Sequence, residues 1–124
     1  MVVRSHLKEA AMTQSFSVNI DTLDKGVVVH LAGDITLTHL DELHDALQQI
    51  IECHPTKVVL DLADLAFINS LGLGVLIEFR QGLAQCGGDL AMACASEHIA
   101  DILRKTRLVE LFPLHPDTKT ALGD

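Results

Sequence analysis

The sequence predicts an α/β fold: a single-domain sandwich whose mixed sheet of four to five strands, with an N-terminal antiparallel hairpin and a largely parallel remainder, packs with about four helices. Three observations predict this class. Alternating apolar and polar residues come first, helical and β-branched segments then alternate, and 124 residues that are 48% hydrophobic can enclose one core. We expect residues 1–13 to form a flexible N-terminal extension and residues 14–124 to form the domain.

The first two strands are expected to form the hairpin. Apolar and polar residues alternate from Phe16 to Asp21, which is the period of a half-buried strand. The turn residues 24–26, Asp-Lys-Gly, separate this strand from the apolar run 27–31, which we expect to end at Gly33. The pair is therefore predicted to be antiparallel, with its first strand near an edge of the sheet.

Helical and strand patterns alternate in the rest of the chain. Leucines and isoleucines recur at helical spacing after Thr38, which we expect to cap the helix, and Pro55 ends it. The segments that follow are a strand at 57–62, a helix at 70–85, a strand at 90–94, a helix opened by Ser96, a short strand at 111–114 and a helix capped by Asp117. This order predicts right-handed crossovers between parallel strands.

Composition excludes several classes of function. The formal net charge of -8 repels nucleic acid and anionic lipid. The longest apolar run, 71–77, is far shorter than the roughly 20 residues that span a bilayer. We therefore expect no nucleic-acid partner, no direct membrane insertion and a cytoplasmic location. Cys53, Cys86 and Cys94 lack the spacing of a disulfide framework or a zinc site, so buried thiols are predicted.

Ser70 lies between a strand pattern and a helical pattern. Its simplest role is that of an N-cap, which accepts a hydrogen bond from a backbone N–H of the first helical turn. The same position also suits a phosphate group, because unpaired N–H groups and the positive end of the helix dipole point outward there. The two roles are compatible, and the residues alone leave both open.

No complete catalytic set accompanies this serine. A hydrolase elbow needs glycine two residues earlier, where this chain has Ile68. Gly72 and Gly74 lack the third glycine of a dinucleotide loop, and we expect them to let the helix start lie close to the sheet or to a partner. His39 and His44 are five residues apart, which does not place them cleanly on one helical face. We therefore predict no enzyme, no cofactor and no metal, with histidines that are structural or at the surface.

Residues 60–96, LDLADLAFINSLGLGVLIEFRQGLAQCGGDLAMACAS, resemble the STAS domain family of anti-sigma factor antagonists. The hallmark of that family is a strand, a short loop of the form Asp-Ser-Ser/Thr-Gly-Leu-Gly and a helix. The resemblance extends over nearly all of residues 15–122, includes Gly33-Asp34, and is most specific from Phe67 to Val75. It implies a STAS-like sandwich.

The resemblance also implies a function. In this family, a partner anti-sigma factor with serine kinase activity phosphorylates the first serine of the loop, which is Ser70 here. The phosphate would stand within a surface made by Leu71 and Leu73 and would switch binding off. The residues that the resemblance assigns to partner binding are Asp34, Thr36, Asn69, Ser70, Leu71, Gly72 and Leu73. Self-association is expected at most as a weak homodimer.

Three departures from the family pattern leave two hypotheses open. Asn69 replaces the loop aspartate, Leu71 replaces the second hydroxyl residue, and Thr36 replaces an acidic residue. The first hypothesis is an anti-sigma factor antagonist that phosphorylation of Ser70 switches off. The alternative is a constitutive interaction or scaffold subunit of a transport or signalling assembly, which is not phosphorylated and in which Ser70 is only a helix cap.

Overall fold

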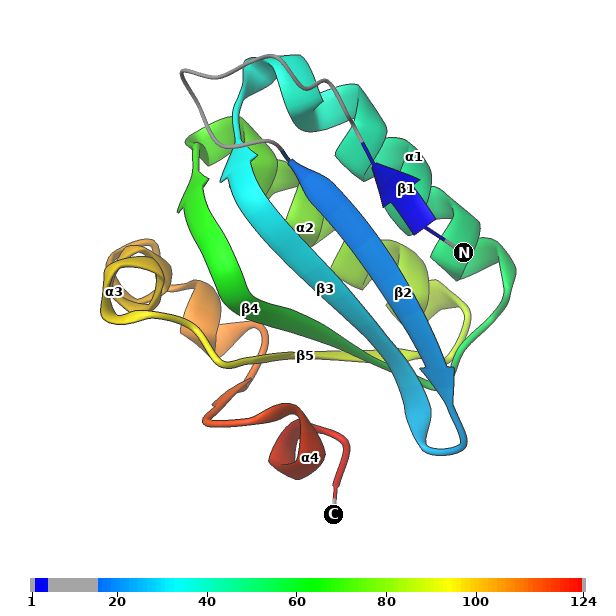
Figure 1. The fold of residues 1–124 in the computed structure, drawn as a ribbon. Helices are drawn as coiled ribbons and strands as arrows, with labels where there is room; N and C mark the ends of the chain where they lie inside the picture. Colours follow the sequence, from blue (N-terminus) through cyan, green and yellow to red (C-terminus); the bar gives the residue numbers. More distant parts are fainter. Residues whose placement is uncertain (1, 5–15, 124) are drawn as a thin grey trace.

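The computed structural model describes residues 2–4 and 16–123. In this part of the chain, a mixed sheet of six strands has the order β1-β2-β3-β4-β5-β6 (Figure 1). The strands are β1 (Val2–Arg4), β2 (Ser17–Leu23), β3 (Gly26–Ile35), β4 (Lys57–Ile68), β5 (Asp89–Ala93) and β6 (Leu114–His115). The helices are η1 (Leu37–His39), α1 (Leu40–Glu52), α2 (Ser70–Gln85), α3 (Glu97–Lys105), η2 (Leu108–Glu110) and α4 (Thr118–Ala121). The predicted α/β class is confirmed. The last strand, expected at 111–114, is found as β6 at Leu114–His115, and the unpredicted β1 brings the strands to six.

β2 and β3 form the predicted antiparallel hairpin, which is in register along the whole of β2. Its turn lies at residues 24–25. β1 pairs antiparallel with the start of β2, a contact that no pattern in the sequence indicated. β1 belongs to the predicted extension, whose residues 1 and 5–13 lie outside the described part of the chain.

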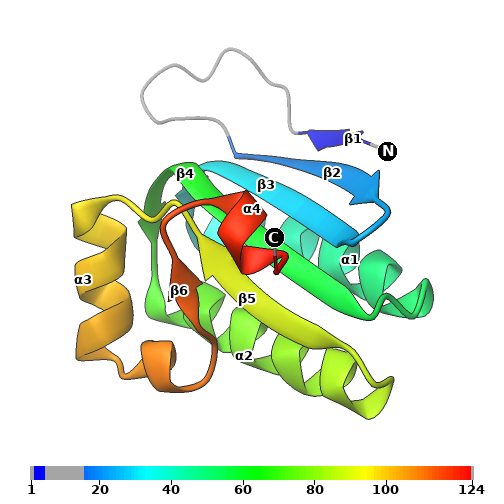
Figure 2. The same ribbon diagram turned by 90° about the horizontal axis from the view of Figure 1, so that it is seen from below.

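The pairs β3–β4, β4–β5 and β5–β6 are parallel. Because these strands advance across the sheet in one direction and parallel crossovers are right-handed, the helices between them must lie on one face. The main core contains Leu43 of α1, Leu76 of α2 and Ile99 of α3, each at most 1% exposed. Figure 2 shows α1 and α2 on one side of the sheet and α4 on the other.

α4 covers part of the opposite face of the sheet. A second, smaller cluster of buried residues consists of Val28, Val59, Ala91, Ala93 and Ala121. As predicted, Asp117 caps this helix, with a carboxylate oxygen that accepts from the N–H of Thr120 at 2.7 Å. The neighbouring part of this face, on β2, β3 and β4, is not covered by α4 and carries polar side chains.

Three local predictions were wrong. β3 continues beyond Gly33, because its pairing with β4 continues there. β4 runs on to Ile68, and two register shifts against β3 accommodate its additional residues as bulges. Thr38 does not cap α1, since it lies inside η1, and His39 at the N-cap position makes no side-chain capping bond.

The three cysteines are not buried as expected. Cys53 and Cys86 are exposed, Cys94 is half-buried, and all three thiols are free. Cys53 and Cys86 are the C-cap residues of α1 and α2. Helix ends lie at the surface of this fold, so their position outweighs the apolar character of cysteine.

Candidate functional site

The carboxyl ends of β3 and β4 lie side by side, and the loop into α2 begins there (Figure 1). Asp34 lies opposite Phe67 in the parallel register. The N–H of Asn69 donates to the carbonyl oxygen of Ile35 at 3.2 Å, which ties the loop to β3. The predicted site residues are therefore gathered at one edge of the sheet.

Asn69, and not Ser70, caps the first turn of α2. Asn69 has extended backbone angles (φ −90°, ψ 175°), and its Oδ1 accepts a hydrogen bond from the N–H of Gly72 at 2.8 Å. Ser70 is the first residue of the helix and is exposed. Within residues 2–4 and 16–123 its hydroxyl makes no hydrogen bond. The expectation that Ser70 is a cap is wrong, because the preceding amide side chain already satisfies the N–H.

Gly72 brings the start of α2 directly against the sheet. A Cβ atom at this position would lie 2.8 Å from Cγ2 of Ile35 and 2.9 Å from Cγ1 of Ile68. These distances are well inside normal carbon–carbon contact. A Cβ atom on Gly74 would meet no described atom within 4 Å. The expected close approach therefore depends on Gly72 and not on Gly74.

Three large apolar side chains are exposed at the same edge as Ser70. Leu37 is 70% exposed, Leu71 is 56% exposed and Phe67 is 40% exposed, and we call them the Leu37–Phe67–Leu71 patch. Leu73 is only 7% exposed and packs in the main core. The expected surface of Leu71 and Leu73 is therefore corrected, because Leu73 faces the sheet and cannot contact a partner.

Sequence analysis missed Leu37 and Phe67. Leu37 lies in η1, a single short turn without an amphipathic period. Phe67 follows the buried Leu65 by two residues, a spacing that predicts the same inward face, but the bulge between these two residues turns Phe67 outward. The signal available in the sequence was only the apolar character of the two residues. That signal is weak, because single exposed apolar residues are common at protein surfaces.

The loop between β3 and α1 is held by its own polar groups. The Nδ1–H of His39 donates to the carbonyl oxygen of Asp34 at 2.7 Å. The imidazole ring also stacks on Phe16, with ring centroids 5.4 Å apart. The hydroxyl oxygens of Thr36 and Thr38 lie 3.0 Å apart in a hydrogen bond. These contacts hold the half-buried Asp34 and Thr36 in place beside the end of β4.

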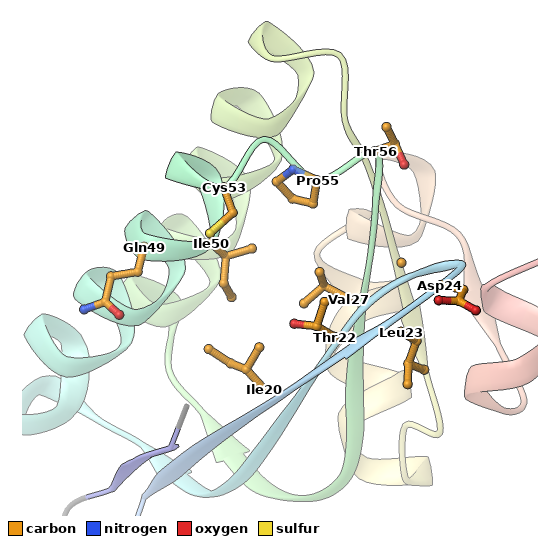
Figure 3. A pocket seen from close by; sticks show the side chains of 11 residues that line it. Ile20, Thr22, Leu23, Asp24, Val27, Gln49, Ile50, Cys53, Pro55 and Thr56 are labelled. Carbon is orange, nitrogen blue, oxygen red and sulfur yellow. The ribbon is translucent and has the colours of Figure 1, made fainter.

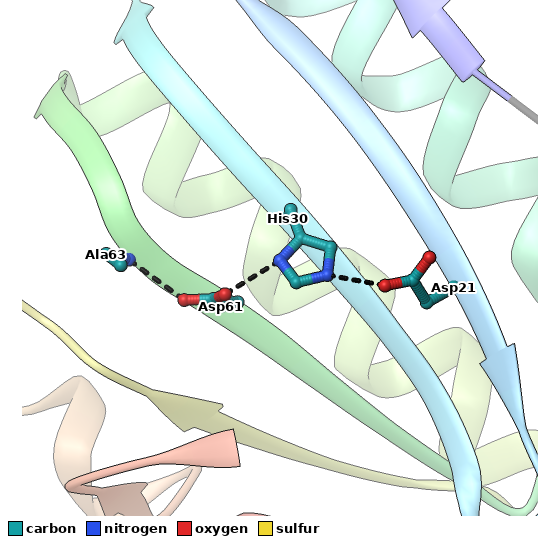
Figure 4. A network of polar contacts seen from close by, with 4 residues as sticks. All are labelled: Asp21, His30, Asp61 and Ala63. Carbon is teal, nitrogen blue, oxygen red and sulfur yellow. Dashed lines mark hydrogen bonds and ion pairs between the residues drawn. The ribbon is translucent and has the colours of Figure 1, made fainter.

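A second polar cluster lies on the open face of the sheet (Figure 4). His30 of β3 donates from Nδ1–H to Oδ2 of Asp61 at 2.7 Å and from Nε2–H to Oδ2 of Asp21 at 2.9 Å. Oδ1 of Asp61 accepts from the N–H of Ala63 at 3.0 Å. Burial lowers the pKa of His30, but the hydrogen bonds and charges of the two aspartates outweigh burial and raise this pKa above its ordinary value. The cluster thus links β2, β3 and β4, and both ring nitrogens of His30 are paired.

The thiol of Cys94 is not activated as a nucleophile. Burial raises the pKa of its thiol, and the nearby Asp61 carboxylate raises it further, so the reactive thiolate is disfavoured. Among the described residues, no group of three or more His, Cys, Asp or Glu side chains could hold a metal ion. In the same part of the chain, no helix has the length and apolar character needed to cross a bilayer.

The chain is similar in sequence to known proteins. The STAS domain model matches residues 17–121. A candidate anti-sigma factor antagonist of Bordetella bronchiseptica, BtrV, is 25% identical over 97 residues, which are 78% of this chain and 84% of that protein. An anti-sigma F factor antagonist of Paenibacillus polymyxa is 24% identical over 99 residues, which are 79% of this chain and 85% of that protein.

A solved structure of this type of protein has the same fold. The crystal structure of an anti-sigma factor antagonist from Mycobacterium paratuberculosis superposes with a TM-score of 0.80 at 25% identity, over 87% of this chain and 92% of that one. The family model covers more than half of the chain. The chain belongs to the STAS domain family, in which its relatives are of the anti-sigma factor antagonist type.

Proposed function

We propose that this chain is an anti-sigma factor antagonist that binds its anti-sigma factor through the edge around Ser70, and that phosphorylation of Ser70 by this partner ends the binding. The names of the relatives support an anti-sigma factor as the partner. Of the residues implied by resemblance, Gly72 and Leu73 are dropped because they are buried, and Leu37 and Phe67 are added because they are exposed. The proposed contact residues are Asp34, Thr36, Leu37, Phe67, Asn69, Ser70 and Leu71.

One observation carries the proposal: Ser70 presents an exposed hydroxyl with no structural task at the edge that bears the Leu37–Phe67–Leu71 patch. The cap of α2 is already made by Asn69. The hydroxyl is therefore accessible to a kinase. An apolar patch surrounded by polar groups is typical of a protein–protein contact, so the same residues suit a partner protein.

A phosphate on Ser70 would oppose that contact through its charge. It would bring roughly -1.5 to -2 charges into the apolar patch at neutral pH. Segments 34–39 and 66–73 contain no lysine or arginine that could pair with it. Burying an unpaired dianion under a partner is strongly unfavourable, so the phosphorylated chain should dissociate unless the partner supplies a cation.

The fold itself should tolerate the phosphate. The first turn of α2 contains no acidic residue, and a negative charge at a helix N-terminus is favourable by about 0.3 to 1 kcal/mol. Ser70 is exposed, so the group stays in water when the partner is absent. Phosphorylation is thus expected to change binding and to leave folding almost unchanged.

The test uses the purified chain, an anti-sigma factor kinase from the same organism, ATP and Mg²⁺. Mass spectrometry locates the phosphate, and calorimetry compares the affinity of the partner for the unmodified and modified chains. We expect modification at Ser70 and loss of binding. Modification only elsewhere, or unchanged affinity after modification of Ser70, contradicts the switch. Failure of the unmodified chain to bind contradicts the choice of partner.

A second candidate function is a constitutive interaction module. The observation that favours it is the neutral amide of Asn69 where the family pattern has an aspartate, because a carboxylate is lacking beside the serine. In this case the patch still binds a partner, but Ser70 is not modified. Partner binding by the unmodified chain, together with the absence of phosphate on Ser70 after incubation with kinase and ATP, would select this candidate.

A further inference from the structure

We propose that the chain has a second binding site, at the edge of the sheet opposite Ser70, for a small uncharged apolar molecule that carries a hydrogen-bond donor. A pocket of about 490 Å³ lies there between the β2–β3 hairpin and the end of α1 (Figure 3). This volume falls within the range of about 300 to 1,000 Å³ that is usual for ligand sites. The site is independent of the proposed anti-sigma factor contact.

The inner wall of the pocket is apolar. Ile20 of β2, Val27 of β3 and Ile50 of α1 line it, and Figure 3 shows their side chains arranged around it. Ile50 is 4% exposed and belongs to the main core, against which Ile20 and Val27 pack. The pocket therefore reaches the core at a point where the hairpin and α1 diverge. A ligand that filled it would remove this apolar surface from water.

Both sides of the pocket pack closely against the backbone of neighbouring segments. A Cβ atom on Gly26, at the base of the hairpin, would lie 2.7 Å from the carbonyl oxygen of Lys57. A Cβ atom on Gly88 would lie 2.6 Å from the carbonyl oxygen of Pro55. The hairpin thus packs directly on the start of β4, and the segment after α1 packs directly on the start of β5. A preformed pocket of this kind binds a ligand without first being ordered.

The outer part of the pocket determines the class of ligand. Among the described residues that line it, Asp24 carries the only charge, and Thr22, Gln49 and Thr56 add uncharged polar groups. The hydroxyl of Thr22, which lies beside Val27 in Figure 3, can accept a hydrogen bond from a ligand, and the Asp24 carboxylate at the turn of the hairpin repels an anion. The net charge of -8 acts in the same direction. An apolar body with an N–H or O–H group, and without negative charge, fits these walls.

The test uses the full chain and a matched pair of fluorescent probes. N-phenyl-1-naphthylamine is apolar, uncharged and carries an N–H donor, and 8-anilino-1-naphthalenesulfonate adds a negative charge to the same ring system. We expect saturable binding of the uncharged probe at one site. The sulfonate should bind at least about tenfold more weakly, because its charge would lie near Asp24.

Two cysteines give a matched pair of variants. Cys53 and Cys86 are exposed C-cap residues of adjacent helices, but only Cys53 lines this pocket. Cys53→Phe should fill the pocket and weaken binding of the uncharged probe at least about tenfold, whereas Cys86→Phe should leave it unchanged. In the unmutated chain, the bound probe should slow alkylation of Cys53 by iodoacetamide and should not slow alkylation of Cys86.

Several results would overturn the inference. These are the absence of saturable binding to the unmutated chain, equal loss in both variants, or unchanged alkylation of Cys53 at saturating probe. The alkylation measurement decides the matter even where Cys53→Phe does not fold. If alkylation of Cys53 without probe slows as protein concentration rises, a second copy of the chain covers the pocket, and the small-molecule assignment is wrong.

Discussion

Two helices of this molecule begin with similar chemistry but use their serines differently. α2 has Asn69 as its N-cap and Ser70 as its first residue, whereas α3 has Ser96 as its N-cap. Each cap accepts a hydrogen bond from the third helical residue, Gly72 at 2.8 Å in α2 and Ile99 at 3.2 Å in α3. The hydroxyl of Ser96 therefore serves the backbone, and that of Ser70 is available to another molecule. A shift of one residue separates a structural serine from a candidate switch.

The first two positions of the helices extend this comparison. The first residue of α3 is Glu97, where α2 has Ser70, and the second is the exposed His98, where α2 has the exposed Leu71. α3 thus carries a permanent negative charge at the position where a phosphate on α2 would lie. A negative charge at this position stabilises both α2 and α3, because it lies at the positive end of the helix dipole. The surroundings differ, because α2 itself contributes Leu71 to the Leu37–Phe67–Leu71 patch, whereas α3 begins with the polar Glu97 and His98.

The largest expected effect is on partner binding. Ser70→Asp should lower the affinity for the anti-sigma factor at least about 100-fold, because a charge would be buried in an apolar contact. The matched control is Ser96→Asp, which also adds a charge at a helix start but keeps a good cap, and its affinity should not change. Calorimetric titration of both variants with the same partner measures the difference.

The melting temperatures complete this test. The Ser70→Asp chain should melt at or slightly above the temperature of the unmutated chain, because aspartate at a helix start is favourable. Equal affinity of the two variants for the partner would show that the start of α2 has no special role in binding. A lower melting temperature for Ser70→Asp would mean that the loss of binding reflects folding and not charge.

The next effect concerns the third helical position, which is Gly72 in α2 and the buried Ile99 in α3. Gly72→Ala should destabilise the fold by about 1 to 3 kcal/mol, because its methyl group would collide with Ile35 and Ile68. Gly74→Ala, two residues later, should be neutral or stabilising by up to about 1 kcal/mol, since alanine is the better helix former. Urea unfolding of the two variants measures both values. A loss of the same size at both glycines would show that helix propensity, and not close packing, governs this turn.

A smaller effect tests which residues are caps. Asn69→Ala and Ser96→Ala should each cost about 1 kcal/mol of unfolding free energy, because each removes an oxygen that accepts an N–H. Ser70→Ala should cost less than about 0.5 kcal/mol, as is usual for surface positions without such a bond. The three variants are compared by urea unfolding under one set of conditions. If Ser70→Ala proves as costly as Asn69→Ala, the hydroxyl of Ser70 has a structural task after all.

The smallest expected effect lies away from both helix starts, in the His30 cluster. The raised pKa means that protonated His30 is stabilised by folding. This contribution is therefore complete below the unfolded pKa of about 6.5 and is lost as pH rises through the folded pKa. His30→Gln should remove this part of the pH dependence of the unfolding free energy, which begins as pH rises above the unfolded pKa. The exposed His44→Gln is the control and should keep it, and an identical pH dependence in all three proteins would contradict the role of the cluster.

The spacing of apolar residues and the residue types at turns and helix ends made most of the fold predictable. The hairpin, the helix of residues 70–85 and the caps at Ser96 and Asp117 follow from alternation, helical spacing and capping preference, and all are confirmed. The errors fall where a neighbour in space decides the outcome. β4 extends beyond residue 62 because β3 continues to pair with it, and the thiols of Cys53 and Cys86 are exposed because they lie at helix ends.

Only some features of the candidate site could likewise be predicted from the sequence. The position of Ser70 at the start of a helix could be read from the sequence, and so could the family resemblance around it. The sequence could not tell whether Ser70 or Asn69 makes the cap, because both residue types are good caps and only backbone angles separate the two positions. It also could not show that Leu73 is buried while Leu37 and Phe67 are exposed, since their environment depends on packing between distant segments.

By itself, the sequence determined the order of strands and helices, the apolar faces that pack together, and a serine at the beginning of α2. These features depend on residues a few positions apart, whose periodicity and turn preferences act locally. Only the tertiary structure decided that the hydroxyl of this serine is free, that three apolar side chains share its edge, and that a pocket stands open at the opposite edge. Each of these depends on β3, β4 and their helices meeting across dozens of residues, where burial and hydrogen bonding follow from three-dimensional contacts and no local pattern encodes them.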